Sequence, residues 1–247
     1  MATDRPALPI AGPVMLLFPF GLLLAALLTP AVGAAPPHLL WAERLVRDLH
    51  PEDNSYGGSP TVVQWRGVDG ATRSQNRSVC SSFITALFRH AYGYDSDEVR
   101  RWLGRSRPKA INYYEAIGKA NRFQPVRTVG LIQPGDLLAS RQLNPTSTIT
   151  GHTMLARTRP LPLAGCPGSV CVYRLQVIDS SRSGHGADDT RRGSSGVGMG
   201  TIQLQATRQG SVLAYRWSEH KTSRWRHASE EPLLIGRFCG QRCPASK

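Results

Sequence analysis

A cysteine stands where a polar turn runs into an amphipathic helix, in the segment Ser78-Val79-Cys80-Ser81-Ser82-Phe83-Ile84-Thr85-Ala86-Leu87-Phe88. Apolar side chains recur along it at helical spacing, which predicts a helix with one buried face. Ser78 is the expected N-cap and Gly93 the expected end of this helix. We place Cys80 two or three positions inside it, where unpaired backbone N–H groups and the helix dipole stabilise a thiolate.

Two later segments each carry one polar group that can work with a thiol. They are Gly151-His152-Thr153-Met154-Leu155-Ala156 and Val177-Ile178-Asp179-Ser180-Ser181, and both are typical of strands. An imidazole at His152 accepts the thiol proton, and a carboxylate at Asp179 holds the imidazole through its second nitrogen. The sequence therefore predicts a catalytic group of Cys80, His152 and Asp179. The alternatives are a small buried cysteine, a structural histidine and an aspartate that forms a turn.

The other four cysteines form two close pairs, Cys166 with Cys171 and Cys239 with Cys243. Each pair spans an expected turn, and in an oxidising compartment such pairs are typical of local disulfides. Four thiolates are also enough to hold zinc, which is the alternative. We predict disulfides and neither metal nor cofactor, which leaves Cys80 as an unpaired thiol kept for chemistry or buried and inert.

The start of the chain resembles a secretory signal over residues 1–34. Residues 14–28 are almost continuously apolar, and small residues precede a cleavage point at Val32-Gly33-Ala34. The apolar stretch is shorter than the roughly 20 residues of a membrane span, although an uncleaved anchor is the alternative. We expect a protein exported to the periplasm or secreted, with one domain over residues 35–247.

The order of helices and strands predicts an α+β fold. Helical periodicity marks 38–49, 96–103 and 111–120 in addition to the cysteine helix. Short branched or alternating runs follow at 137–139, 153–157, 172–179, 202–206, 212–217 and 233–238, after one strand candidate at 61–65. Helices followed by strands favour helices packed on an antiparallel sheet. The Gly-rich stretch from Ser180 to Gly200 is interpreted as one long loop.

The charge is strongly basic, with 30 Lys and Arg against 17 Asp and Glu, a formal net charge of +13. A basic surface favours polyanions, and for an exported protein these are anionic wall polymers or lipid surfaces rather than nucleic acid. The basic residues form no dense run, so scattered surface arginines are the alternative interpretation. Nothing in the sequence indicates the oligomeric state.

Three segments resemble those of one family. Val79-Cys80-Ser81-Ser82-Phe83-Ile84 resembles the Asp-Cys-Ser-Gly-Phe-Val nucleophile segment of NlpC-type and CHAP-type cell-wall hydrolases. Gln133-Pro134-Gly135-Asp136-Leu137-Leu138 is similar to the family's Pro-Gly-Asp-Leu segment, and Gly151-His152-Thr153-Met154-Leu155 to its histidine strand. The resemblance implies a papain-like fold and hydrolysis of peptide or amide bonds in peptidoglycan. Val79 and Ser82 depart from the pattern, and Asp179 fits the third polar position by its place alone.

A few polar residues keep two interpretations each. Tyr56 is similar to an oxyanion-assisting tyrosine of that family but lies farther upstream than usual, so a turn residue is the simpler interpretation. Gln75 and Asn76 either cap the helix or donate to an oxyanion. Asp136 is interpreted as a turn or sheet-edge residue, and His185 as an exposed loop residue. Asn76-Arg77-Ser78 also matches a glycosylation sequon.

Three functions are compatible with these features. The first is an exported thiol hydrolase that cleaves cell-wall peptides. The second is a non-catalytic wall-binding module on the same fold, and the third is a thiol acyltransferase, since NlpC-like folds also host acyl transfer through a Cys–His pair. An intact set of Cys80, His152 and Asp179 favours the first and third over the second.

Overall fold

The computed structural model describes Met1 and residues 34–243, except residues 164 and 167. The predicted signal at residues 1–34 therefore lies almost wholly outside the described residues. The described residues from Ala35 onward form one unit. Among the described residues, none belongs to a helix long and apolar enough to cross a membrane.

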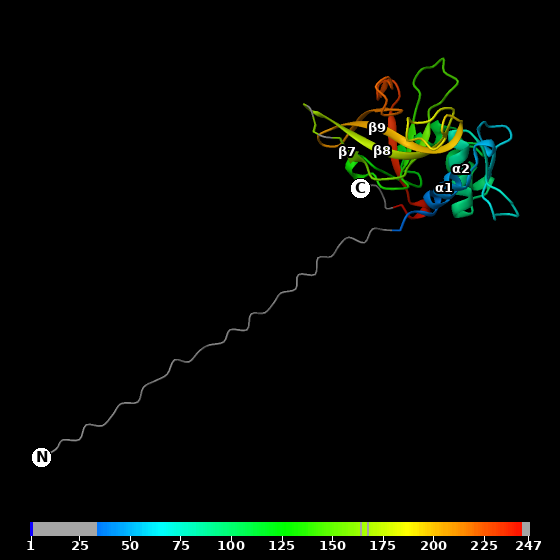
Figure 1. Cartoon of the computed structure of the whole chain (residues 1–247), viewed down its shortest axis with the longest axis horizontal. Helices are drawn as coiled ribbons and strands as arrows, with labels where there is room; N and C mark the ends of the chain where they lie inside the picture. The colour runs from blue at the N-terminus through cyan, green and yellow to red at the C-terminus, as the bar shows by residue number, and fades with distance from the viewer. Residues whose placement is uncertain (2–33, 164, 167, 244–247) are drawn as a thin grey trace. The chain divides into compact units, whose positions relative to one another are not determined.

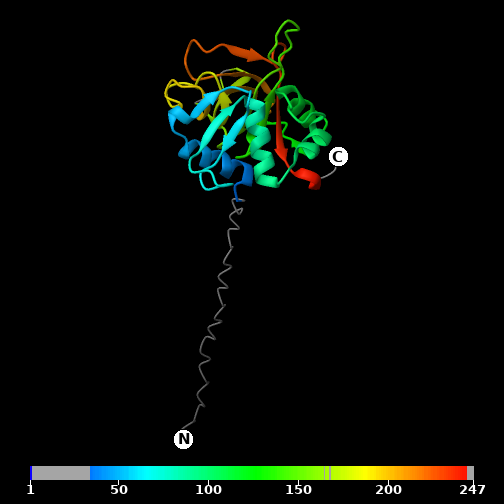
Figure 2. The same cartoon turned by 90° about the vertical axis from the view of Figure 1, so that its right-hand side faces the viewer.

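Four α-helices lie in the first half of the described chain, and the cysteine helix is central among them. They are α1 (Pro37–Asp48), α2 (Cys80–Tyr92), α3 (Ser96–Leu103) and α4 (Ala110–Gly118), with short 3₁₀ turns at Pro51–Asp53, Val129–Leu131 and Gly240–Arg242. Helices α1 and α2 lie side by side (Figures 1 and 2). Helix α2 ends at Gly93, whose φ of 71° is the left-handed conformation that suits glycine.

Two sheets complete the fold. The larger is antiparallel and has the order β11-β10-β9-β8-β6-β5-β12-β4, with β7 paired to β8. Its strands are β4 (Phe123–Pro125), β5 (Leu137–Ser140), β6 (Thr153–Ala156), β7 (Leu161–Pro162), β8 (Val170–Ser181), β9 (Gly196–Thr207), β10 (Val212–Arg216), β11 (Trp225–His227) and β12 (Leu233–Phe238). The smaller sheet has the order β1-β3-β2, from β1 (Asn54–Tyr56), β2 (Val62–Gln64) and β3 (Gln75–Ser78), and its β1–β3 pair is parallel. The expected α+β class is confirmed.

The central strands of the larger sheet are buried on both faces. Successive strand residues point to opposite faces, so Leu155 and Ile178 pack with the helices while Met154 and Val177 join a second apolar cluster. Tyr215 of β10 belongs to that second cluster together with residues of β5, β9 and β12. Strands from both halves of the sheet thus contribute to the second cluster, and burial on both faces explains why the short strands β5 and β6 are mostly apolar.

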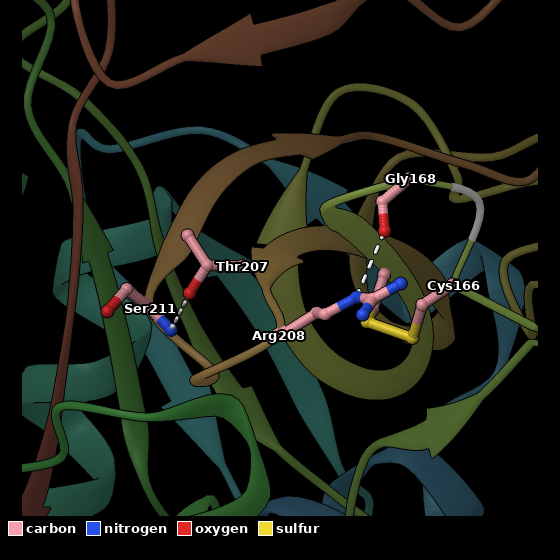
Figure 3. Close-up of a disulfide and its surroundings, with 6 residues drawn as sticks. Cys166, Gly168, Thr207, Arg208 and Ser211 are labelled. Atoms are coloured by element: carbon pink, nitrogen blue, oxygen red, sulfur yellow. Dashed lines mark hydrogen bonds between the residues drawn. A yellow bond between two sulfur atoms is a disulfide. The ribbon is translucent and has the colours of Figure 1, made fainter.

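Strands β8 and β9 form the longest hairpin of the fold, visible as the long ribbons in Figure 1. Their register runs without a break from Val170 opposite Thr207 to Ser181 opposite Gly196. The predicted Cys166–Cys171 disulfide lies at the open end of this hairpin, where Arg208 donates a hydrogen bond to the Gly168 carbonyl (3.0 Å; Figure 3). The predicted Cys239–Cys243 disulfide is also present, and Cys80 is a free thiol.

The expectation of one loop from Ser180 to Gly200 is wrong. Ser180 and Ser181 extend β8, and the strand β9 begins at Gly196, so the connection spans only residues 182–195. The glycines of β9 face side chains that fold back over the strand: a Cβ on Gly198 would lie 2.5 Å from Cγ of Arg191. The glycines therefore serve close packing in a strand rather than loop mobility.

Candidate active site

Cys80 is the first residue of α2, not the second or third, and Val79 takes the N-cap position in place of Ser78. The Ser82 hydroxyl accepts a hydrogen bond from the Val79 N–H (3.0 Å), which fixes the first turn without a capping side chain on Val79. The Cys80 side chain is 6% exposed. At this position its backbone N–H has no partner within the helix and stays available as a donor.

Ser78 instead links the segment before Cys80 to the larger sheet. Its hydroxyl donates to Oδ1 of Asn76 (2.6 Å), and its carbonyl accepts a hydrogen bond from the buried Ser180 hydroxyl of β8 (2.7 Å). Ser180 follows Asp179 directly. This bond ties the residue before the helix to the strand that carries the aspartate, so the predicted site residues from distant parts of the sequence come together.

His152 lies just before β6, and its backbone is held on both sides. Its N–H donates to the Ser140 hydroxyl (2.9 Å), and its carbonyl accepts from the Ser140 N–H (2.8 Å). Gly151 has a φ of 134°, and a Cβ there would lie 1.9 Å from the Ser140 carbonyl oxygen. Only glycine fits this position, so the Gly-His pair is a backbone requirement of the place where the imidazole enters the site.

The imidazole of His152 bonds Asp179. Its Nε2 lies 2.5 Å from Oδ2 of Asp179, which leaves Nδ1 as the nitrogen available to a thiol. Burial alone would lower the pKa of His152, but the neighbouring Cys80 thiolate and the Asp179 hydrogen bond raise it to about 10. Burial likewise opposes ionisation of Cys80, yet interaction with the charge of His152 holds the pKa of the thiol below its usual value. Both shifts favour a thiolate–imidazolium pair.

Asp179 is fully buried, and the side chains of Arg191 and His185 bond it. Burial would raise its pKa, but the charges of His185 and Arg191 together with hydrogen bonds hold the pKa well below the usual range. Arg191 and His185 both donate to Oδ1, the latter at 3.0 Å, while Oδ2 is used by His152. Arg191 also donates to Asp189 (2.7 Å). The carboxylate is therefore fixed in place and ionised.

The interpretation of His185 as an exposed loop residue is wrong. Its side chain has no exposed surface, and its Nδ1 donates to the Trp217 carbonyl (2.8 Å). Since the other nitrogen donates to Asp179, both ring nitrogens act as donors. The reason for burial is the fold of the 182–195 connection, which turns back over the glycines of β9 and so brings His185 and Arg191 to Asp179.

Trp217 covers the hydrogen bonds of both histidines. Its ring lies edge-on to His152 with centroids 4.9 Å apart, and against His185 at 4.3 Å. An aromatic ring at this place excludes water from the His152–Asp179 bond, and a hydrogen bond to a charged group is stronger where water is excluded. Trp217, Arg191 and His185 are the residues that sequence reasoning missed.

Tyr56 is not a turn residue but the last residue of β1, half-buried beside the site. Burial and the nearby charge of Cys80 raise the pKa of its phenol, so the hydroxyl stays protonated. The guanidinium of Arg182 lies over its ring, 5.6 Å from the centroid. The Tyr56 hydroxyl is thus a protonated donor close to Cys80.

The remaining polar candidates have structural roles. Asp136 is buried and accepts bonds from the Gln133 N–H (2.8 Å) and from Arg237 (2.9 Å), in agreement with its interpretation as a turn residue. Asn76 is 2% exposed and donates to Asn54 (2.9 Å), so it neither caps α2 nor presents its sequon at the surface. The described residues hold no cluster of three His, Cys, Asp or Glu side chains that would bind a metal, and the disulfides remove the cysteines needed for zinc.

Two cavities adjoin the imidazole. One of about 300 Å³ is lined by Tyr56 and His152, and it shares Trp217 and Arg226 with a neighbouring cavity of about 630 Å³. A separate cavity of about 610 Å³ is lined by residues at the start of α2, Val79, Ser81 and Ser82 among them. Cys80 itself is buried and is not among the lining residues of these three cavities.

Comparison with known proteins assigns no activity to this chain. It is similar to the uncharacterized protein R653 of Acanthamoeba polyphaga mimivirus, with 28% identity over 219 residues, which covers 82% of this chain and 96% of the viral protein. No family model matches the sequence. No solved structure matches it either.

Proposed function

We propose that this protein is a thiol hydrolase with a papain-like fold of the NlpC or CHAP type, in which Cys80 is the nucleophile, His152 the acid and base, and Asp179 the group that orients the imidazole. The observation that carries the proposal is the hydrogen bond from Nε2 of His152 to the buried carboxylate of Asp179, with the unpaired Cys80 thiol at the start of α2 beside the same imidazole. The order of these three groups on helix, strand and strand is that of the family that the sequence resembles.

The chemistry follows from the thiolate–imidazolium pair. The Cys80 sulfur attacks the carbonyl carbon of a peptide or amide bond, and the His152 imidazolium gives its proton to the nitrogen as the carbon–nitrogen bond breaks. The amine leaves and a thioester remains on Cys80. Water then attacks the thioester while His152 takes a proton from it, which releases a carboxylic acid and restores the original pair. The reaction requires neither metal nor redox cofactor.

Two donors near the sulfur suit the negative oxygen of the tetrahedral intermediate. The Cys80 N–H is unpaired within α2, and a donor at this place strengthens its bond as the oxygen becomes charged. The Tyr56 hydroxyl, protonated at neutral pH, is the second donor in this proposal. This is the oxyanion-assisting role of the similar tyrosine in that family, although Tyr56 lies farther upstream in the sequence than usual.

Peptidoglycan peptides are the proposed substrate, on the strength of the three motif resemblances. The two disulfides fit an oxidising compartment, which is where such a substrate would be met outside the cell membrane. A thiol acyltransferase would use the same Cys80 and His152 and differ only in the acceptor that attacks the thioester. A non-catalytic binding module is less favoured, because a fixed, ionised Asp179 behind His152 has no use in binding alone.

The test is hydrolysis of peptidoglycan-derived peptides, followed by mass spectrometry. Cys80→Ala is expected to abolish turnover and His152→Ala to lower it by about 10²- to 10⁴-fold, the usual contribution of a general acid–base. Arg127→Gln, at an exposed position away from the three groups, serves as the control. Wild-type activity in Cys80→Ala would exclude the mechanism, and acyl transfer to an added amine without hydrolysis would favour the transferase.

A further inference from the structure

Glu231 is a buried carboxylate whose polar partners come from three different strands. It lies in the turn between β11 and β12 and is 6% exposed. Its Oε1 accepts hydrogen bonds from the hydroxyls of Ser140 at the end of β5 (2.7 Å) and Tyr215 of β10 (2.6 Å). Its Oε2 accepts one from Arg226 of β11 (2.7 Å). Burial opposes ionisation of Glu231, but the bonds from the two hydroxyls and the charge of Arg226 hold its pKa below the usual value, so the carboxylate is charged.

The Ser140 hydroxyl connects this carboxylate to the backbone of His152. A carboxylate only accepts hydrogen bonds, so the single hydrogen of the Ser140 hydroxyl points to Glu231. The lone pairs of the same oxygen then serve as acceptors, and one of them takes the hydrogen bond of the His152 N–H (2.9 Å). Glu231 thus sets the orientation of the group that holds the His152 N–H.

The bond between the Ser140 hydroxyl and His152 replaces one bond of the regular β5–β6 ladder. The register of this ladder ends at Ala139 opposite Thr153, and Ser140 and His152 are the next pair. A hydrogen-bonded pair of an antiparallel ladder exchanges two bonds between N–H groups and carbonyls. Here the Ser140 N–H donates to the His152 carbonyl (2.8 Å), but the His152 N–H donates to the hydroxyl, while the Ser140 carbonyl lies against Gly151. The position of the His152 backbone therefore depends on a side chain.

The second oxygen of Glu231 acts on the ring that covers the imidazole. Arg226, which donates to this oxygen, places its guanidinium over the Trp217 ring, 5.7 Å from the centroid. The Trp217 ring lies edge-on to His152 with centroids 4.9 Å apart. A cation over the face of a tryptophan is attracted by the ring. The ion pair of Arg226 and Glu231 thus supports the ring that covers His152.

We propose that Glu231 is a positioning residue for the proposed reaction, which holds His152 in place through other residues. It acts on the His152 backbone through Ser140 and on the covering ring through Arg226. The inference rests on the proposed function for the role of His152 as acid and base. Replacement of a buried ion pair by apolar residues is often neutral or stabilising, so stability alone is a weak reason for a charge at this place. A charged acceptor, however, orients its donors more strongly than a neutral one does.

The experiment compares two variants that each remove one hydroxyl from the same oxygen of Glu231. Ser140→Ala and Tyr215→Phe both lose a buried donor to Oε1, and Ser140 is the one of the two that also bonds His152. The measurement is the rate of Cys80 alkylation by iodoacetamide against pH, which reports how strongly the imidazole stabilises the thiolate. In Ser140→Ala this titration should move upward by about 0.5–1 pH unit, the equivalent of one hydrogen bond. In Tyr215→Phe it should stay at the wild-type position.

Glu231→Ala removes both connections to His152 and should move the titration upward at least as far as Ser140→Ala. The effect of Ser140→Ala should be smaller in a Glu231→Ala background than in the wild type, because the two residues act along one path. Hydrolysis of the peptide substrate gives a kinetic counterpart. Ser140→Ala should lower kcat by about three- to tenfold with little change in KM, since the general acid–base is displaced and Ser140 lines none of the cavities described above.

A merely structural network predicts a different pattern. Ser140→Ala and Tyr215→Phe would then lower the melting temperature by similar amounts and share one alkylation titration, and that result overturns the inference. A wild-type titration in Glu231→Ala also overturns it, and if Glu231→Ala does not fold, the two hydroxyl variants still decide. Failure of the proposed function is seen separately: a titration that stays unchanged in His152→Ala shows that His152 is not the partner of the thiol, whatever the other variants do.

Discussion

Arg191 is expected to be essential to stability because it is a buried cation between two buried carboxylates. Its side chain has no exposed surface, and it donates to Asp179, to Asp189 and to the Gly196 carbonyl. Replacement by methionine keeps most of the volume and leaves both carboxylates without this partner. Removal of one partner from a buried ion pair costs about 3–5 kcal/mol, because the charge that remains stays buried.

The expected measurement is a fall in melting temperature. For a domain of this size each kcal/mol shifts the midpoint by about 2–4 °C, so Arg191→Met should melt roughly 6–20 °C below the wild type. Arg127→Met, the same change at an exposed position, should lie within about 0.5 kcal/mol of the wild type. In Arg191→Met/Asp179→Asn the loss should be smaller than in Arg191→Met, since one unpaired charge is gone.

The pH dependence gives a second, independent measure. The pKa of Asp179 is depressed in the folded protein, so its stabilisation is present above the unfolded value of about 3.9 and is lost as pH falls through the lower folded value. Arg191→Met raises the folded pKa toward the unfolded value, so the gain in stability as pH rises to about 4 should be smaller than in the wild type. A melting temperature for Arg191→Met equal to that of Arg127→Met at neutral pH would refute this account of the buried charges.

Further predictions concern the thiol, its partners and the disulfides. Alkylation of Cys80 should titrate below the free-thiol pKa of about 8.5, and this titration should move upward in His152→Ala. Asp179→Asn should lose less activity than His152→Ala. The wild-type rate should fall at alkaline pH as His152, whose pKa is about 10, loses its proton. In Asp179→Asn this fall should occur at lower pH, because the carboxylate that stabilises the imidazolium is gone. Cys166→Ser/Cys171→Ser should cost about 2 kcal/mol of stability and leave the Cys80 titration unchanged, since the disulfide closes a short loop at the far end of the β8–β9 hairpin.

The parts of the fold that sequence predicted are those with a local signal. Helical periodicity located α1, α2, α3 and α4 to within a few residues, and the apolar runs located the central strands. Strands β1 and β3 were not predicted, because they are polar and are held by side-chain bonds: Asn76 donates to Asn54, and Asn54 donates to the Val197 carbonyl far along the chain. No local pattern records such bonds.

The candidate site likewise has residues that a local sequence pattern predicts and residues that it does not. The Gly-His pair before β6 and the cysteine at the start of α2 have local causes, so they were recognised from residue type and order. The two donors behind Asp179 lie in a Gly-rich stretch that resembles an exposed loop. A signal was present in Gly196-Val197-Gly198-Met199-Gly200, where glycine at every second position leaves one face of a strand bare. A bare face in a buried strand requires another segment to fill it.

The 182–195 connection, which covers the glycine face of β9, explains how the proposed mechanism can move a proton without destabilising the protein. His152 must lose its proton when the amine leaves and regain one from water. If His152 alone compensated the Asp179 charge, each loss would leave a buried carboxylate without a cation. Oδ1 of Asp179 is instead paired with Arg191 and bonded by His185, so Oδ2 remains available to His152 throughout. The charge of Asp179 is thus balanced by groups that take no part in the proton transfer, and the imidazole is oriented equally well in both of its protonation states.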